Sequence, residues 1–151
     1  MLSTPQPRVL CVDDDEDSRV MLIALLRLAL IEAKAVGTAA QALSLMETER
    51  FDLYLLDAWL PGLDGFELCR RMRAFDPHTP ILFFSGAAHE ADKKRGIEAG
   101  ADAYVIKPDV DGLVGRITEF VSHAENATAK IIPFGRKMSF SPPLTFEPAA
   151  A

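Results

Sequence analysis

The sequence contains few cysteines and no excess of basic residues. Only two of its 151 residues are cysteines, Cys11 and Cys69, and their spacing fits neither a disulfide framework nor a metal-binding motif. We expect both to be reduced packing residues of a cytoplasmic protein. The formal net charge is −6, whereas binding to nucleic acid independently of sequence requires a basic surface that displaces counterions. We therefore expect no direct binding to nucleic acid.

Long hydrophobic runs are also missing. The longest apolar stretch, VMLIALLRLALI at residues 20–31, contains Arg27 and is shorter than the about 20 apolar residues that a helix needs to cross a bilayer. The N-terminal segment MLSTPQPR has no apolar core of the kind found in signal peptides. With 49% hydrophobic and 25% charged residues, the chain has the composition of a soluble globular protein and the length of one domain. We expect a cytoplasmic location and no membrane partner.

Five short apolar runs alternate with helical patterns along the chain. Each run is apolar throughout, as expected for parallel strands that are covered on both faces. This alternation predicts a doubly wound α/β fold with a five-stranded parallel sheet and five helices. The predicted strands are residues 8–12, 33–37, 52–56, 80–86 and 102–108, and the predicted helices are residues 18–31, 38–49, 64–75, 90–99 and 110–124.

Charged and polar residues stand at the carboxyl ends of four predicted strands. They are Asp13 and Asp14 at the first strand, Asp57 at the third, Ser85 at the fourth and Lys107 at the fifth. In a doubly wound sheet these ends border the crevice in which ligands bind, so we expect the five side chains to converge. The rest of the acidic run, residues 15–17, suits the positive end of a helix dipole and is interpreted as a solvated helix start.

Three converging carboxylates form a site of hard oxygen ligands, which suits Mg²⁺ or Mn²⁺. Beside such an ion a carboxylate can attack a phosphoryl group, because phosphoryl transfer chiefly requires in-line positioning and neutralisation of charge on the equatorial oxygens. The ion, Lys107, and Ser85 with nearby backbone amides would each stabilise one of those oxygens. Asp57 is nearest the middle of the sheet and is the predicted acceptor.

At these residues the sequence resembles the receiver domain of bacterial two-component response regulators, of the single-domain type. The segments VLCVDDD, LYLLDAWLPGLDG, ILFFSGA and AGADAYVIKP occur in the family's order and spacing. The resemblance implies a flavodoxin-like, three-layer α/β/α fold with the strand order 2-1-3-4-5. We divide the chain into an N-terminal extension (1–7), a receiver domain (8–125) and a tail (126–151) without an output domain.

The resemblance also implies a ligand set for the ion. Asp14, Asp57 and the backbone carbonyl of Trp59 would bind Mg²⁺ directly, and Asp13 would act through water. Members of the family are regulators rather than enzymes: their chemistry is limited to their own phosphorylation from a donor and to autodephosphorylation.

A phosphorelay function is implied as well. Asp57 would accept a phosphoryl group from a phosphohistidine on a histidine kinase or a histidine phosphotransfer protein. Ser85 would then move toward the phosphoryl group, and Tyr104, which matches the family's switch aromatic, would turn inward. The signal would reach an unidentified downstream protein through the surface of the fourth helix, fifth strand and fifth helix.

Three positions depart from the family's pattern. Trp59 and Ala87 stand two residues after Asp57 and Ser85, where side chains influence how fast water reaches the aspartyl phosphate. A large Trp59 would exclude water and Ala87 offers no group to orient it, so we predict a long-lived phosphoryl state. The alternative is that Trp59 is merely an aromatic residue at the rim. Asp109 follows the Lys-Pro pair, where an apolar residue is usual, which predicts weaker anchoring of the fifth helix.

Two further segments are candidates for contacts with partners. On a helical wheel one face of the first predicted helix points away from the sheet and is unusually apolar; it contains Val20, Ile23, Arg27 and Ile31. We interpret it as the docking face for the phosphohistidine protein, with a homodimer contact as the alternative. The tail contains three phenylalanines and four prolines at residues 126–151, and we predict an interaction segment there.

Two other functions compete with the phosphoacceptor. A haloacid-dehalogenase-like phosphatase also uses an Asp nucleophile and Mg²⁺, and Asp13 and Asp15 have its D-x-D spacing. The chain lacks that family's later acidic motif and has no room for a cap domain, so this alternative is remote. A receiver-like module that docks independently of phosphate is the closer rival, although the complete set of five strand-end residues argues against it.

Overall fold

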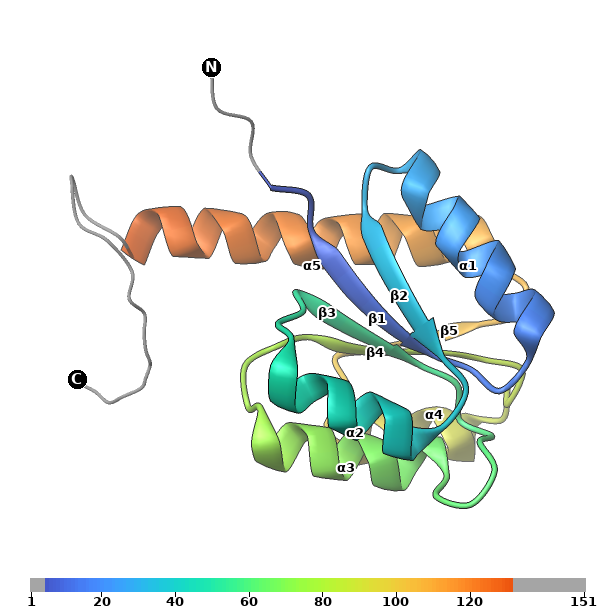
Figure 1. Ribbon diagram of the computed structural model, residues 1–151. Coiled ribbons are helices and arrows are strands. Elements are labelled where there is room, and N and C mark those ends of the chain that lie inside the picture. Colours follow the sequence, from blue (N-terminus) through green and yellow to red (C-terminus); the bar gives the residue numbers. More distant parts are fainter. Residues whose placement is uncertain (1–4, 132–151) are drawn as a thin grey trace. The chain divides into compact units, whose positions relative to one another are not determined.

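The computed structural model describes residues 5–131, in which five strands alternate with five helices (Figure 1). The strands are β1 (Arg8–Val12), β2 (Glu32–Val36), β3 (Leu53–Leu56), β4 (Ile81–Ser85) and β5 (Ala103–Ile106). The helices are α1 (Glu16–Leu28), α2 (Ala39–Thr48), α3 (Gly65–Phe75), α4 (Glu90–Ala99) and α5 (Val110–Ile131).

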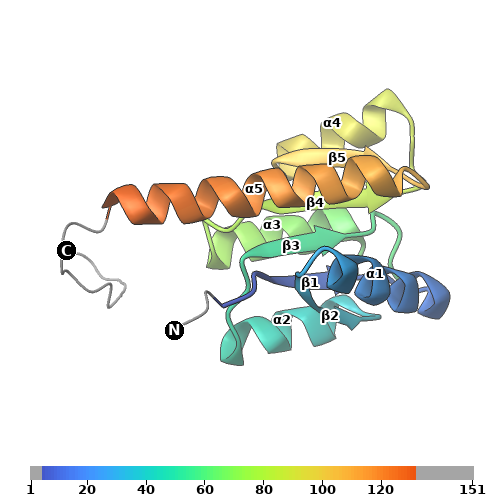
Figure 2. The ribbon, with the colours of Figure 1, turned by 90° about the horizontal axis from the view of Figure 1, so that it is seen from above.

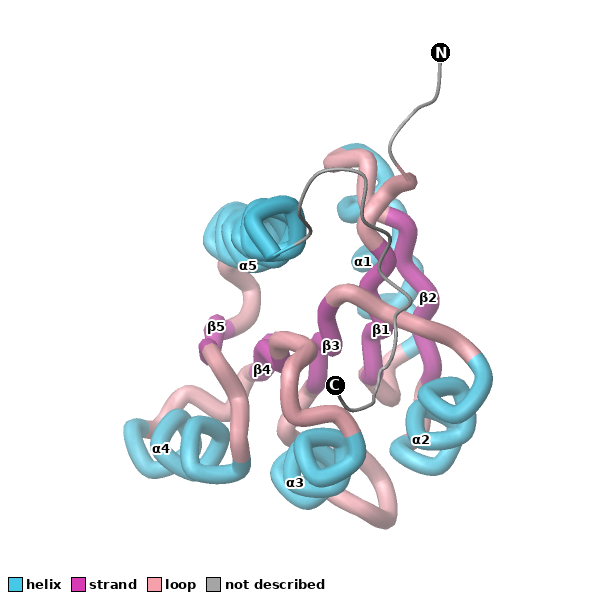
Figure 3. The backbone as a smooth tube through the Cα atoms, turned by 90° about the vertical axis from the view of Figure 1, so that its left-hand side faces the viewer, coloured by secondary structure: helices cyan, strands magenta, loops and turns pink. Residues whose placement is uncertain are grey.

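The sheet has the predicted topology. All five strands are parallel, and their order is β2-β1-β3-β4-β5, which confirms the doubly wound fold and the strand order. Helices α1 and α5 cover one face of the sheet, and α2, α3 and α4 cover the other (Figure 3). Seen from above, α1 and α5 lie in front of the strands, and α3 lies behind them (Figure 2).

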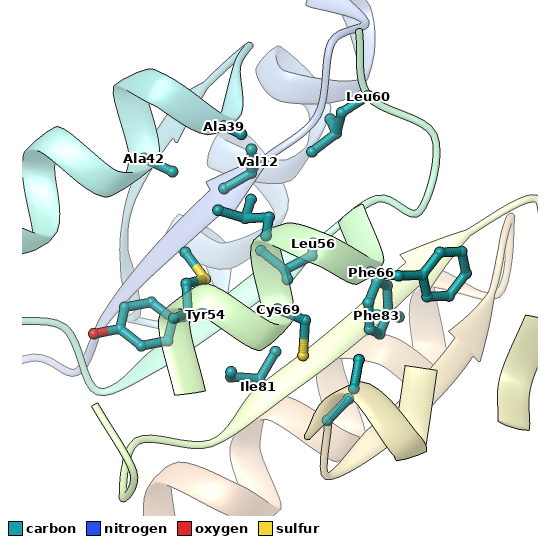
Figure 4. Packing of buried hydrophobic residues seen from close by; sticks show 14 of the residues in the cluster. Val12, Ala39, Ala42, Tyr54, Leu56, Leu60, Phe66, Cys69, Ile81 and Phe83 are labelled. Carbon is teal, nitrogen blue, oxygen red and sulfur yellow. The ribbon is translucent and has the colours of Figure 1, made fainter. Parts of the chain in front are cut away.

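Successive residues of a strand pack on opposite faces, and in β1, β3 and β4 both faces are buried. In β1, Leu10 and Val12 belong to the hydrophobic cluster under α2 and α3, part of which Figure 4 shows. Val9 and Cys11 belong to the cluster under α1 and α5. Because the residues on both faces of these strands are apolar, each of the strands is a continuous hydrophobic run in the sequence.

Aspartates cap three helices at their N-termini: Asp15 caps α1, Asp64 caps α3 and Asp109 caps α5. Asp15 Oδ2 accepts a hydrogen bond from the backbone N–H of Ser18 at 2.8 Å, and the remaining acids of residues 15–17 lie in the first turn of α1. This confirms that the later part of the acidic run is a helix start. Asp109 Oδ1 accepts from the backbone N–H of Gly112 at 2.9 Å and so caps α5. Asp109 therefore anchors the start of α5, and the weaker anchoring predicted from this residue is not found.

Two helix ends differ from the prediction. Helix α1 ends at Leu28 because Leu30 adopts a left-handed backbone (φ 62°) and the backbone N–H groups of Leu30 and Ile31 bond to carbonyls of the last turn. Helix α5 runs to Ile131 rather than to residue 124, so the start of the predicted tail is helical. The interaction segment predicted for the tail otherwise lies outside the described residues, and our domain boundaries stay predictions.

The chain divides into two units, residues 1–121 and 122–151, and the candidate site lies entirely in the first. Within residues 5–131, no helix combines the length and the apolar character needed to cross a membrane.

The two cysteines are buried and free, as predicted. Burial raises the pKa of the Cys11 thiol to about 12 and that of Cys69 to about 11. Since the thiolate is the reactive form, we expect neither residue to react with a disulfide reagent in the native protein, whereas both react after unfolding in urea. The reaction is followed by the absorbance of the released thiolate at neutral pH. Rapid modification of either thiol without denaturant would contradict the packing described here.

Candidate functional site

The register of the sheet brings the strand-end residues together. Val12 of β1 pairs with Val36 of β2 and with Leu56 of β3, so β1 and β3 end side by side. The residue after each strand continues the ladder: the backbone N–H of Asp13 bonds to the Val36 carbonyl, and that of Asp57 to the Val12 carbonyl. The positions of both carboxylates are therefore fixed by the central strands.

Three carboxylates meet at this edge. Oxygen atoms of Asp13, Asp14 and Asp57 lie within 4.8 Å of one another and could hold a metal ion. Asp13 and Asp57 are only 2% and 8% exposed, whereas Asp14 is exposed to solvent. Buried carboxylates that lie this close repel one another unless cations or hydrogen-bond donors compensate. The arrangement thus requires positive charge at the site.

Lys107 supplies part of that charge. Its Nζ donates to Asp13 Oδ2 at 2.8 Å and to Asp57 Oδ2 at 3.0 Å, so that it bridges the two buried carboxylates. Burial lowers the pKa of Lys107, but the hydrogen bonds that its ammonium group donates to Asp13 and Asp57 outweigh this effect and hold the pKa above its ordinary value. The ammonium group is therefore charged at neutral pH.

The second oxygen of Asp57 accepts from two other donors. Ser85 Oγ donates to Asp57 Oδ1 at 2.8 Å, and the backbone N–H of Trp59 donates to the same oxygen at 3.2 Å. Ser85 is itself fully buried, and its Oγ accepts from the backbone N–H of Ala87 at 3.2 Å. Asp57 is thus held by hydrogen bonds on both of its oxygens, which orient the carboxylate.

The start of α3 lies unusually close to Asp57. The backbone N–H of Gly65 donates to the Ala58 carbonyl at 2.9 Å. A Cβ atom at Gly65 would collide with the carbonyl oxygen of Asp57 and would lie 2.8 Å from the Cα of Ala58. Only glycine allows this approach, which holds the loop between β3 and α3 beneath the acceptor.

Trp59 lies at the rim of the site. Its side chain is 54% exposed, and its ring meets Phe66 edge-on, with 6.2 Å between the centroids. The Arg95 guanidinium also lies close to Phe66, 4.1 Å from the centre of that ring. Ala87, the other position predicted to tune the site, is buried.

Tyr104 is in the inward position in this structure. Its hydroxyl donates to the carbonyl of Ala87 at 2.7 Å, and its ring stacks on Phe83 with 5.3 Å between the centroids. Burial raises the pKa of its hydroxyl. A line of contacts therefore runs from Asp57 through Ser85 and Ala87 to Tyr104.

Only part of the predicted docking face is exposed, and its docking role stays a prediction. Val20 is 62% exposed and Arg27 is exposed, but Ile23 is half-buried and Ile31 is buried at 3%. Ile31 does not lie on the predicted face, because α1 ends before it and the following turn places its side chain in the core. The exposed apolar residues that the helical wheel missed are Met21, Leu28 and Leu30.

Sequence reasoning also missed Arg19. Its Nη1 donates to the backbone carbonyl of Asp13 at 2.9 Å, so that α1 is tied to the loop that carries the acidic pair. A signal was available: Arg19 is the first basic residue after five acids.

The comparisons with known proteins agree with this geometry. Residues 9–118 match the model of the response regulator receiver domain, so the chain belongs to this family. Among solved structures, a CheY-like receiver domain protein of Methanospirillum hungatei is 30% identical, with a TM-score of 0.76 over 81% of this chain and 98% of that chain. A response regulator of Chloroflexus aurantiacus is 32% identical, with a TM-score of 0.73 over 78% of this chain and 98% of that one.

Relatives with longer chains are also similar. The DNA-binding response regulator MtrA of Mycolicibacterium smegmatis is 36% identical over 135 residues, which are 89% of this chain and 59% of MtrA. The transcriptional regulatory protein AfsQ1 of Streptomyces coelicolor is 38% identical over 85% of this chain and 57% of AfsQ1. The chain thus spans little more than half the length of these relatives.

These findings confirm the family and overturn one prediction. We expected no direct binding to nucleic acid from the acidic composition of the chain. That prediction is contradicted by relatives that are named as DNA-binding response regulators. The net charge of a receiver domain describes the receiver alone, whereas DNA binding in a longer regulator depends on the surface of its other parts.

Proposed function

We propose that this receiver domain accepts a phosphoryl group on Asp57 from a phosphohistidine donor, in a reaction that depends on Mg²⁺ or Mn²⁺. The observation that supports it best is the bridge from Lys107 Nζ to Asp13 and Asp57 beside a third carboxylate. In the transfer, a carboxylate oxygen of Asp57 forms a bond to phosphorus, and the bond from phosphorus to the imidazole nitrogen of the donor breaks. The chain acts as a regulator and catalyses no turnover of other substrates.

The donor set fits a hard divalent cation. The three side chains that could bind the ion are all carboxylates, and the exposed Asp14 leaves the site open to solvent on one side. Asp14, Asp57 and the carbonyl of Trp59 are the proposed direct ligands, and Asp13 is proposed to act through water. A bound ion supplies charge neutralisation for one phosphoryl oxygen.

The protein groups perform the remaining steps. Hydrogen bonds from Ser85 and from the Trp59 backbone orient the Asp57 carboxylate for in-line attack. As negative charge builds up on the phosphoryl oxygens, Lys107 and Ser85 are in position to exchange their bonds to Asp57 for bonds to those oxygens. Tyr104 then reports the change through Ala87, whose amide and carbonyl bond to Ser85 and Tyr104 respectively.

Binding of beryllofluoride, which mimics an acyl phosphate, tests this proposal without any partner protein. Titration calorimetry in Mg²⁺ is expected to show one site in the unaltered chain and none in Asp57→Asn. Asp111→Asn removes an exposed carboxyl group in α5 and is expected to bind like the unaltered chain. Equal binding by Asp57→Asn would contradict the assignment of the acceptor.

The predicted long lifetime of the phosphoryl group can be tested at Trp59. Replacing Trp59 with alanine is expected to shorten the half-life on the order of tenfold, equivalent to about 1.4 kcal/mol of activation free energy, because the indole excludes water from the acyl phosphate. Phe75→Ala, which removes another exposed aromatic ring (63% exposed, against 54% for Trp59) at the end of α3, serves as the control. An unchanged half-life in Trp59→Ala would contradict the shielding role of Trp59, and a half-life of only seconds in the unaltered chain would contradict the long-lived phosphoryl state.

The output of the whole protein is a separate proposal. The names of MtrA and AfsQ1 support control of transcription as that output. We expect transcript levels to respond to the signal in the unaltered strain and not to respond in an Asp57→Asn strain. The cytoplasmic location stays a prediction.

A further inference from the structure

Helix α4 contains a glycine where a glycine is unfavourable. Gly96 lies in the second half of α4 (Glu90–Ala99), and its backbone is buried. Glycine within a helix destabilises it relative to alanine, because it loses more conformational freedom on folding. Unlike Gly100, which ends the helix in a left-handed conformation, Gly96 is not at a terminus. Its absence of a side chain therefore calls for a tertiary explanation.

The space beside Gly96 is filled by two aromatic rings. A Cβ atom on Gly96 would lie 2.9 Å from Cδ2 and 3.1 Å from Cε2 of Tyr104, and 3.1 Å from Cδ2 of Phe83. These distances are shorter than an ordinary carbon–carbon contact. Phe83 is fully buried in β4 and has no room to yield. Tyr104, which is only partly buried, is the ring that would have to move.

The position of Tyr104 is defined by three contacts. One side of its ring stacks on Phe83, with an angle of 22° between the planes, and another approaches the backbone of α4 at Gly96. The hydroxyl reaches the Ala87 carbonyl at 2.7 Å. Helix α4 lies against β5, which carries Tyr104 (Figure 3). The ring therefore occupies a slot between α4 and β4, and a methyl group at position 96 would narrow it.

We propose that Gly96 is a positioning residue that keeps this slot open and thereby sets the fraction of molecules in which Tyr104 is turned inward and bonded to Ala87. An alanine at position 96 shifts Tyr104 toward an outward, solvent-exposed position. The packing part of this proposal does not depend on phosphorylation. Its consequence for signalling rests on the proposed function, because the same hydrogen bonds connect Ala87 through Ser85 to Asp57.

Fluorine NMR of 3-fluorotyrosine tests the packing directly. The chain has two tyrosines, Tyr54 and Tyr104, so a labelled sample gives two resonances, which Tyr54→Phe assigns. The shift of each resonance between H₂O and D₂O increases with exposure of the ring. Gly96→Ala is expected to raise this difference at Tyr104 toward the value of free fluorotyrosine and to leave it unchanged at Tyr54. A folded Gly96→Ala protein in which Tyr104 shows the unaltered value would overturn the proposal.

Gly115→Ala is the matched control. Gly115 also lies within a helix, but nothing comes within 4 Å of a Cβ atom built there. We expect Gly115→Ala to raise the melting temperature and to leave Tyr104 unchanged. Gly96→Ala is expected to lower the melting temperature in the unaltered chain and to lower it less in a Tyr104→Leu background, where the nearer ring is gone and only the contact with Phe83 remains. The same loss in both backgrounds would overturn the proposal even if Gly96→Ala alone proved too unstable for NMR.

Beryllofluoride binding separates this inference from the proposed function. If the function is correct, Gly96→Ala is expected to bind beryllofluoride several-fold more weakly than Gly115→Ala, because the inward state of Tyr104 and the occupied site favour each other. Equal affinities of the two variants would overturn the coupling that we infer. Absence of binding to the unaltered chain would contradict the proposed function, while the NMR result would still decide whether Gly96 positions Tyr104.

Discussion

Replacing Lys107 with methionine is expected to slow phosphorylation of Asp57 by about 10²–10³-fold, the usual effect of removing one group that stabilises a developing oxyanion. The ammonium group is the one cationic side chain in the described residues that bonds directly to Asp57, and it also bonds to Asp13. Methionine keeps much of the length of the side chain but neither the charge nor the donors. The rate is measured with acetyl phosphate in Mg²⁺, by intact mass against time.

The affinity for Mg²⁺ distinguishes this effect from loss of the metal site. Lys107 competes with a cation for Asp13 and Asp57, so the affinity of Lys107→Met for Mg²⁺ is expected to be equal to or higher than that of the unaltered chain. Lys94→Met, which removes an exposed ammonium group in α4, serves as the control for the loss of a lysine. A Lys107→Met protein that is phosphorylated as fast as Lys94→Met would show that the bridge observed here has no catalytic role.

Replacing Gly65 with alanine is expected to lower the free energy of unfolding by about 2–3 kcal/mol, the upper part of the range for overpacking. The added methyl group collides with the backbone of Asp57 and Ala58, which central strand β3 holds in place. Relief of the collision therefore requires α3 to move away from the sheet. Urea unfolding followed by circular dichroism measures the loss.

Gly115→Ala again provides the comparison, because its methyl group meets no neighbour. It is expected to stabilise the chain by up to about 1 kcal/mol through helix propensity. A folded Gly65→Ala protein should in addition bind beryllofluoride more weakly, since the shift of α3 displaces the loop after Asp57. Equal unfolding free energies for the two variants would contradict the close approach at Gly65.

The strands could be predicted from the sequence because their signal is local. Residues 8–12 were predicted with the bounds that β1 has, and the strands predicted at residues 52–56 and 102–108 agree with β3 and β5 to within two residues at each end. Short apolar runs that alternate with helices along a chain form a parallel sheet with helices on both faces, and few other folds are compatible with this pattern. Once the strands were placed, parallel pairing alone predicted that their carboxyl ends, and the residues there, would converge.

The features that sequence reasoning missed depend on contacts between distant residues. The burial of Ile31 follows from the left-handed turn at Leu30, which the helical pattern of the sequence does not predict. The bond from Arg19 to the Asp13 carbonyl follows from the packing of α1 beside the loop. The cap formed by Asp109 depends on where α5 begins. A helical wheel assumes an endless helix and contains none of this information.

Intact-mass analysis after incubation with acetyl phosphate and Mg²⁺ tests the central proposal most directly. The unaltered chain is expected to gain one phosphoryl group, whereas Asp57→Asn, and the unaltered chain in EDTA, gain none; Asp111→Asn is expected to gain one. An adduct that persists in Asp57→Asn or in EDTA would contradict Asp57 as the acceptor or the need for a divalent cation. No adduct on the unaltered chain, together with no binding of beryllofluoride, would contradict phosphoryl transfer and favour a receiver domain that docks independently of phosphate.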